Sequence, residues 1–175
     1  MRRNDREVES HEEILGILNK CDVIHLGINT PNYPYVVPMN FGIEAGEKSL
    51  TLWLHCAGEG LKLDLIKQNF RVGFEADCSH KLMPGEQACN YTMEYESVIG
   101  CGEIHICDDI QSKRRGLKAI MEHYEPEKDF AVPDRAIVSV CVLRLEIRQI
   151  TGKQLRNHKD TQKDTDGGSG LKEKM

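Results

Sequence analysis

Thr92 to Cys107 reads Thr-Met-Glu-Tyr-Glu-Ser-Val-Ile-Gly-Cys-Gly-Glu-Ile-His-Ile-Cys, and this segment decides the fold. It is predicted to be one long extended strand that is interrupted only by Gly100 and Gly102. At ~3.3 Å per residue such a strand would span ~50 Å, whereas a folded body of this size has a radius of gyration of only ~15 Å. The strand must therefore bend at its glycines or reach beyond its own domain, which makes it a candidate subunit interface.

The segments on either side of this strand predict a mainly β protein with flanking helices. Short turns separate the extended segments, which favours antiparallel pairing, and six strands with few helices favour a closed barrel. Ser10 followed by Glu13 is typical of a helix start. The predicted helices are 11–20, 60–68 and 109–124, the other predicted strands are 23–29, 35–43, 50–55, 71–78 and 136–150, and 80–90 and 126–133 are expected to be connections.

The chain has 175 residues, and 23 lysines and arginines against 28 aspartates and glutamates give a net charge of −5. This negative charge disfavours nucleic acid as the main partner, because a groove for phosphates needs the opposite sign. No apolar run approaches the ~18 residues that span a membrane, and the charged first residues do not resemble a secretory signal. We expect one folded domain over residues 1–152 and a polar, flexible tail over 153–175.

Seven cysteines without a Cys-x-x-Cys pair predict a reduced, cytoplasmic protein rather than a disulfide-linked one. Cys78 and His80 are the one pair at a metal-ligand spacing, and nothing nearby in the sequence completes a ligand set. The sequence therefore predicts no metal site, and the cysteines are expected to be buried apolar side chains.

A strand, a glycine turn and a helix follow one another over residues 54–62, in the order Leu-His-Cys-Ala-Gly-Glu-Gly-Leu-Lys. Glycines let backbone amides approach an anion, the helix start offers unpaired N–H groups, and Lys62 adds a full positive charge. The segment thus predicts a phosphate site, although a tight turn with a solvated lysine has the same pattern. His55 directly precedes the turn and is either a catalytic residue or a hydrogen-bonded structural histidine.

Pro38 interrupts the predicted strand over residues 35–43. Proline cannot donate a backbone hydrogen bond to a sheet, so it indicates a strand edge or a bulge. The backbone of Met39 and Asn40 is then free to bind a flat polar ring, unless the edge serves only to prevent aggregation.

Four segments stand out together, in this order: Val36-Val37-Pro38-Met39-Asn40-Phe41, His55-Cys56-Ala57-x-x-Gly60-x-Lys62-x-Asp64-x-Ile66, Asn90-Tyr91-Thr92-Met93-x-Tyr95-x-Ser97-Val98-x-Gly100-x-Gly102 and Ile150-Thr151-Gly152-Lys153. Over residues 2–154 the chain resembles the nitroimidazole-resistance (Nim-type) proteins of the flavin-binding split-barrel group, which is related to the pyridoxamine-phosphate oxidases. The resemblance implies a six-stranded antiparallel split β-barrel with Greek-key-like topology. It also implies a homodimer with a flavin bound at the interface.

The same resemblance implies roles for single residues. Contacts with the flavin ring are expected at Pro38, Met39 and Asn40, and contacts with the phosphate and ribityl chain at His55, Cys56, Ala57, Gly60 and Lys62. Tyr95, Ser97 and Val98 are expected to approach the cofactor from the partner subunit, and Lys153 is expected to contact it. His55 is the catalytic candidate. FMN is the expected cofactor, with FAD as the alternative.

The activity implied is that of a flavin-dependent oxidoreductase that reduces a small nitro-aromatic or a related planar acceptor, as in resistance to 5-nitroimidazole antibiotics. One alternative is a non-catalytic flavin-binding or sensing protein, and another is a pyridoxamine-phosphate-oxidase-like enzyme. A third is a barrel that binds a different small ligand, or haem through His55 or His80.

Overall fold

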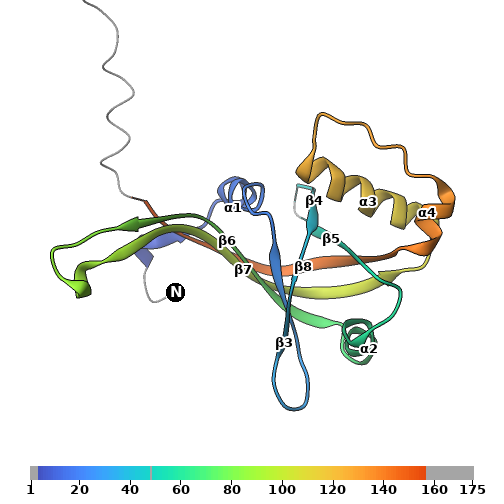
Figure 1. Ribbon diagram of the computed structural model, residues 1–175, viewed down its shortest axis with the longest axis horizontal. Helices are drawn as coiled ribbons and strands as arrows, with labels where there is room; N and C mark the ends of the chain where they lie inside the picture. The colour runs from blue at the N-terminus through green and yellow to red at the C-terminus, as the bar shows by residue number, and fades with distance from the viewer. Residues whose placement is uncertain (1–3, 48, 157–175) are drawn as a thin grey trace, which may run out of the picture.

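The computed structural model describes residues 4–47 and 49–156 and consists mainly of an eight-stranded antiparallel sheet (Figure 1). Its strand order is β3-β2-β6-β7-β8-β5-β4, and β1 pairs with β8 beside this path. The strands are β1 Glu7–Val8, β2 Ile24–Ile28, β3 Tyr35–Met39, β4 Phe41–Ala45, β5 Leu50–Cys56, β6 Arg71–Met83, β7 Thr92–Cys107 and β8 Cys141–Leu155. The helices are α1 His11–Leu18, α2 Leu61–Gln68, α3 Ile110–Tyr124 and α4 Asp134–Ser139, with short 3-10 turns at Asn4–Arg6 and Ala88–Asn90.

The sheet curls round without closing. Its two edge strands, β3 and β4, are consecutive in the chain and are separated by Asn40 alone. Within the described residues β3 pairs only with β2, and β4 only with β5. The prediction of a closed barrel of six strands is therefore wrong in both closure and number. The single strand predicted over 35–43 is two strands, and β1 was not predicted.

The side chains around Asn40 explain this error. Met39 and Phe41 are both buried, and Asn40 between them is exposed, so the in-and-out alternation of a single strand continues across the break. A period of two is the main signal for a strand in a sequence. It does not report that the backbone changes its hydrogen-bonding partner from β2 to β5.

β6 and β7 form a long hairpin, and its tip projects as an arm beyond the end of β8 (Figure 1). β7 has the predicted bounds, whereas β6 continues past its predicted end at Cys78 as far as Met83. A β-bulge between Cys78 and Lys81 shifts the register, and Ser79 within it has a φ of 59°. Pairing with β7 resumes after the bulge, so residues 80–83 are strand and not the predicted loop.

The predicted final strand also differs from the observed one at both ends. Residues 134–139 form α4, which begins after Pro133 and carries Asp134 in its first turn, where a negative charge stabilises a helix. β8 therefore starts at Cys141 and continues to Leu155, three residues past the predicted domain end. The rest of the predicted tail, 157–175, lies outside the described residues.

The three predicted helices are confirmed, with ends that differ by at most two residues. The hydroxyl of Ser10 accepts a hydrogen bond from the Glu13 backbone N–H at the start of α1, and Asp109 accepts one from Ser112 at the start of α3. α1 and α2 help to build the main core, and α3 covers a second cluster around Trp53. A Cβ atom on Gly42 would lie 2.3 Å from the Ala119 carbonyl carbon, so α3 rests directly on β4.

Candidate functional site

The first group of candidate residues lies where β5 ends and α2 begins. His55 and Cys56 are the last two residues of β5, and the following turn leads to Gly60, the N-cap of α2. Gly60 has a φ of 128°, a conformation that suits glycine. A Cβ atom on Gly58 or Gly60 would meet no atom within 4 Å, so the space beside the turn is open to a ligand.

Lys62 lies close to this turn and is half-buried. Burial and the neighbouring thiol of Cys141 raise the pKa of Cys56 to about 11, and the positive charge of Lys62 opposes that rise. The Lys62 ammonium is therefore near the end of β5, which distinguishes it from a lysine that only faces solvent. The first N–H groups of a helix have no partner within it and attract anions. Open space, helix start and lysine together fit a phosphate group.

The pairing of β4 with β5 brings Asn40 close to the end of β5. Phe41 pairs with Leu54 between β4 and β5, so the residues that come next on the two strands, Asn40 and His55, are brought together. The Tyr124 hydroxyl accepts hydrogen bonds from the Asn40 side-chain amide at 3.2 Å and from the Phe41 backbone N–H at 3.1 Å. Sequence reasoning missed Tyr124, because no local pattern links the end of α3 to residue 40.

The other two predicted ring contacts lie on β3. Pro38 is exposed on this edge strand, as predicted, and pairs with His25 of β2. Met39 is 6% exposed and belongs to the main core, so only its backbone can contact a ligand. Asn40 is exposed and follows Met39 directly. The backbone of this segment thus lies at the edge of the sheet. Its last residue, Asn40, lies beside His55.

A second group of candidates lies on β7 and β8. Ser97 pairs with Lys153, and the Lys153 Nζ atom is 5.9 Å from the centre of the Tyr95 ring. Val98 pairs with Gly152, and its side chain is fully buried, so its backbone alone can contact a cofactor. The structure therefore brings together Tyr95, Ser97 and Lys153.

These two groups lie at opposite ends of β8. Cys56 pairs with Cys141 at the start of β8, and Ser97 pairs with Lys153 near its end. The strand between these points is ~40 Å long at ~3.3 Å per residue. A single mononucleotide is much shorter than this stretch of strand, which argues against contacts with both Lys62 and Lys153 of the same chain.

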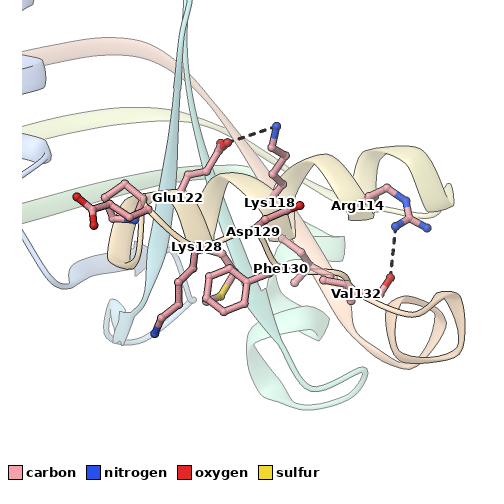
Figure 2. Close-up of a pocket in the computed structure, with 11 residues that line it drawn as sticks. Arg114, Lys118, Glu122, Lys128, Asp129, Phe130 and Val132 are labelled. Atoms are coloured by element: carbon pink, nitrogen blue, oxygen red, sulfur yellow. Dashed lines mark hydrogen bonds and ion pairs between the residues drawn. The ribbon is translucent and has the colours of Figure 1, made fainter.

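A cavity of about 430 Å³ lies elsewhere, between α3 and the connection to α4 (Figure 2). Its basic side chains already have partners: Lys118 pairs with Glu122 at 3.3 Å, Lys128 pairs with Glu125, and Arg114 donates to the Val132 carbonyl. Leu117, Met121 and Phe130 supply its apolar wall. None of the predicted site residues lines this cavity, and its paired cations do not offer a phosphate site.

A model of the pyridoxamine 5'-phosphate oxidase family matches residues 10–154. The chain belongs to this family. Within the pyridoxamine 5'-phosphate oxidase family, the chain is 35% identical to a proposed 5-nitroimidazole antibiotic resistance protein from Bacteroides thetaiotaomicron VPI-5482. The alignment covers 84% of this chain and 85% of that one, with a TM-score of 0.73. The resemblance seen in the sequence is thereby confirmed.

More distant solved structures share the fold. The flavocytochrome Anf3 from Azotobacter vinelandii is 19% identical, with 90% of this chain and 72% of that chain covered and a TM-score of 0.73. The FAD and heme binding protein from Mycobacterium smegmatis is 15% identical, with 87% and 74% covered and a TM-score of 0.76. A comparison with curated protein sequences gave no match.

The fold is thus that of the pyridoxamine 5'-phosphate oxidase family, and flavin-binding proteins are among its structural neighbours. In the part of the chain that the structure describes, no helix is both long enough and apolar enough to cross a membrane. The roles of the individual site residues stay predictions. The structure adds that the phosphate-site candidates and the β7–β8 candidates form two separate groups.

Proposed function

We propose that the protein binds FMN and acts as a flavin-dependent oxidoreductase that reduces a small nitro-aromatic or a related planar acceptor. The observation that carries this proposal is the open turn at Gly58 and Gly60, with the start of α2 and Lys62 beside it and Asn40 next to His55. The 35% identity to a proposed 5-nitroimidazole resistance protein supports the choice of acceptor.

In this proposal the residues of the chain bind and orient the flavin and protonate the acceptor. A bound flavin supplies the electrons. Lys62 and the first N–H groups of α2 hold the phosphate, and the backbone at Met39 and Asn40 holds the ring. Tyr124 fixes Asn40 in place through its hydrogen bonds. His55 is placed beside the turn to donate a proton to the acceptor, because an imidazole holds and releases a proton near neutral pH.

Replacement of Lys62 by alanine is expected to weaken FMN binding by about tenfold to a hundredfold. A hydrogen bond to a charged group contributes about 1.5–3 kcal/mol, and ~1.4 kcal/mol corresponds to a factor of ten in affinity. The measurement is a fluorescence titration of the flavin-free protein with FMN. Mass spectrometry of the flavin released from the purified protein decides between FMN and FAD.

Lys67→Ala is the matched control for this titration. Lys67 is exposed and lies in the last turn of the same helix, at the opposite end from Gly60. Its loss should leave the affinity for FMN unchanged. Equal affinities of the Lys62→Ala and wild-type proteins would refute the phosphate site. A purified protein that carries no flavin and binds none on titration would refute the proposed function as a whole.

We further propose a homodimer in which the second group, Tyr95, Ser97 and Lys153, completes the flavin site of the partner subunit. The length of β8 between the two groups argues against a site made by both within one chain. Apolar side chains on the strands near this group support an interface, because Met93 and Ile99 are 41% and 60% exposed. A monomer in light scattering with flavin bound would contradict the dimer.

A mixing experiment tests whether the site is shared between subunits. Lys62→Ala and Lys153→Ala chains are each expected to bind FMN weakly, since each lacks one half of every site. After unfolding and refolding together, half of the dimers should contain one chain of each kind, and each of these has one intact site, so about a quarter of all sites should recover wild-type affinity. No recovery would show that both lysines act within the same chain.

A further inference from the structure

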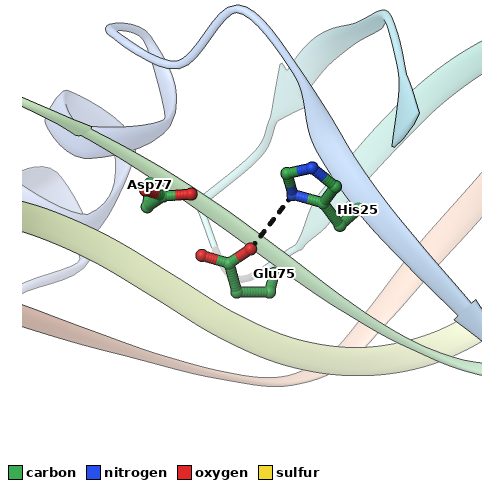
Figure 3. A group of neighbouring side chains, drawn as sticks. All are labelled: His25, Glu75 and Asp77. Atoms are coloured by element: carbon green, nitrogen blue, oxygen red, sulfur yellow. Dashed lines mark hydrogen bonds and ion pairs between the residues drawn. The ribbon is translucent and has the colours of Figure 1, made fainter. Parts of the chain in front are cut away.

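A cluster of potential metal ligands lies on the face of the sheet that points away from the main core (Figure 3). His25 of β2 and Glu75 of β6 are direct cross-strand partners, and Asp77 follows Glu75 on the same face of β6. The ligand atoms of all three side chains lie within 4.8 Å of one another. The His25 Nδ1 and Glu75 Oε2 atoms are 3.2 Å apart.

A second histidine reaches this cluster because of the β-bulge in β6. Residues 77 and 80 of a regular strand would point to opposite faces, since side chains alternate. The bulge between Cys78 and Lys81 changes this phase, and Ser79 adopts a positive φ within it. As a result His80 Nε2 lies 2.5 Å from Asp77 Oδ2. Bulges commonly re-aim a side chain in this way at functional sites.

In the described part of the chain, the carboxylates of the cluster are paired with histidines and not with lysines or arginines. Within residues 4–47 and 49–156, no lysine or arginine forms an ion pair with Glu75 or Asp77, whose partners are the two histidines. Two adjacent carboxylates that repel each other are relieved by a bound cation.

A second group of potential ligands shows the contrast. Glu103, His105 and Glu146 also lie close together, but Arg148 donates hydrogen bonds to Glu103 at 2.6 Å and to Glu146 at 3.3 Å. A positive charge therefore already neutralises these carboxylates. This group serves as an internal control, because its potential ligand atoms are equally close together but already pair with an arginine.

We infer that His25, Glu75 and Asp77 form a binding site for a divalent transition-metal ion, with His80 as a positioning residue that holds Asp77. Zinc binds imidazole nitrogens and carboxylate oxygens at ~2.0–2.2 Å in tetrahedral sites, which places neighbouring ligand atoms ~3.3 Å apart. His25 and Glu75 are hydrogen-bonded at 3.2 Å, so their ligand atoms would need to move little to bind one ion together. Carboxylate ligands are commonly held by a further hydrogen bond, as His80 holds Asp77.

The cluster borders the strand segment that the proposed dimer would bring to the flavin, since Asp77 pairs with Ser97 across β6 and β7. The metal site does not rest on the proposed function, because its ligands are not the predicted flavin contacts.

The test is a calorimetric titration of the full-length, EDTA-treated protein with zinc chloride. One Zn²⁺ per chain is expected to bind, and His25→Ala and Glu75→Gln should each weaken binding at least about tenfold. His80→Ala should weaken it by about tenfold to a hundredfold through the loss of the Asp77 contact, the usual effect of an outer partner. His105→Ala in the internal control group should bind as the wild type does.

Cobalt(II) gives a second measurement that separates this site from the cysteines. The absorption spectrum of the Co²⁺-loaded protein should lack a thiolate-to-cobalt band, because the inferred ligands are nitrogen and oxygen. Circular dichroism of each variant confirms that it is folded. If His25→Ala does not fold, Glu75→Gln alone tests the site. The inference is overturned if the wild type binds no zinc, if the His25 and Glu75 variants bind it unchanged, or if a thiolate band appears.

Discussion

The double variant Lys20→Ala, Arg156→Ala is expected to lose about 3–5 kcal/mol in the free energy of unfolding, because it leaves a buried carboxylate without a cation. Glu96 is 3% exposed and faces away from water. It accepts hydrogen bonds from Lys20 Nζ at 2.6 Å and from Arg156 Nε at 2.7 Å. Chemical denaturation at pH 7 measures the loss.

A triple variant gives the matched control. Adding Glu96→Gln to the double variant removes the buried charge and should recover part of the lost stability. A triple variant that is no more stable than the double variant would show that the two cations act through packing and not through Glu96. A double variant as stable as the wild type would contradict the prediction directly.

The effect should also depend on pH. Burial favours a higher pKa for Glu96, but the hydrogen bonds from Lys20 and Arg156 outweigh it and lower the pKa below its ordinary 4.5. A lowered pKa in the folded state stabilises the fold above the ordinary value, and this stabilisation is lost as the pH falls through the lowered value. Without the two cations burial alone acts on Glu96, so the double variant has a raised pKa at this residue. The difference in stability between wild type and double variant should therefore be full near neutral pH, shrink as the falling pH passes this raised pKa, and vanish below the lowered pKa of the wild type.

Replacement of His55 by alanine is expected to slow the reoxidation of the reduced, flavin-saturated protein by a nitroimidazole about 10²–10⁴-fold, the usual contribution of a positioned acid. Reduction of a nitro group consumes protons, and His55 is exposed at the end of β5, beside the turn that would hold the phosphate. Stopped-flow absorption at saturating flavin measures the rate apart from any loss of flavin affinity.

His11→Ala is a control for this experiment, because His11 is exposed in the first turn of α1 and is not one of the predicted flavin contacts. It should react at the wild-type rate. If flavin-saturated His55→Ala also reacts at the wild-type rate across pH 5–8, His55 only binds the cofactor. Its role in proton donation would then be excluded, while the proposed flavin site would stand.

Local patterns predicted the elements that local forces determine. The capping residue Ser10 and the glycine turn before α2 marked two of the helix starts, and the extended segment over residues 92–107 gave the bounds of β7. The failures occur where pairing between distant segments decides. At Asn40 the chain leaves one edge of the sheet and joins the other, while the alternation of buried and exposed side chains continues. After the bulge at Cys78, β6 continues as a strand because β7 is there to pair with it.

The same distinction between local and distant contacts separates the site residues that the sequence predicted from those that it missed. The turn at Gly60 and the adjacent Lys62 were visible as a motif, since their residues are close in sequence. Tyr124, which holds Asn40, is 84 positions away from it, and His25 is 50 positions away from Glu75. Only the sheet and the packing of α3 bring such residues together. No spacing rule in one sequence identifies them.

The strand order also has a consequence for how the protein folds. β6 and β7 are joined by residues 84–91, whereas the pairing of β5 with β8 closes residues 57–140, a loop about ten times longer. Loop closure entropy makes the longer closure less favourable by ~2 kcal/mol. We therefore expect the β6–β7 hairpin to form early and the β5–β8 ladder late. Because that ladder fixes the end of β5, a partly folded chain has an arm but no place yet for a phosphate.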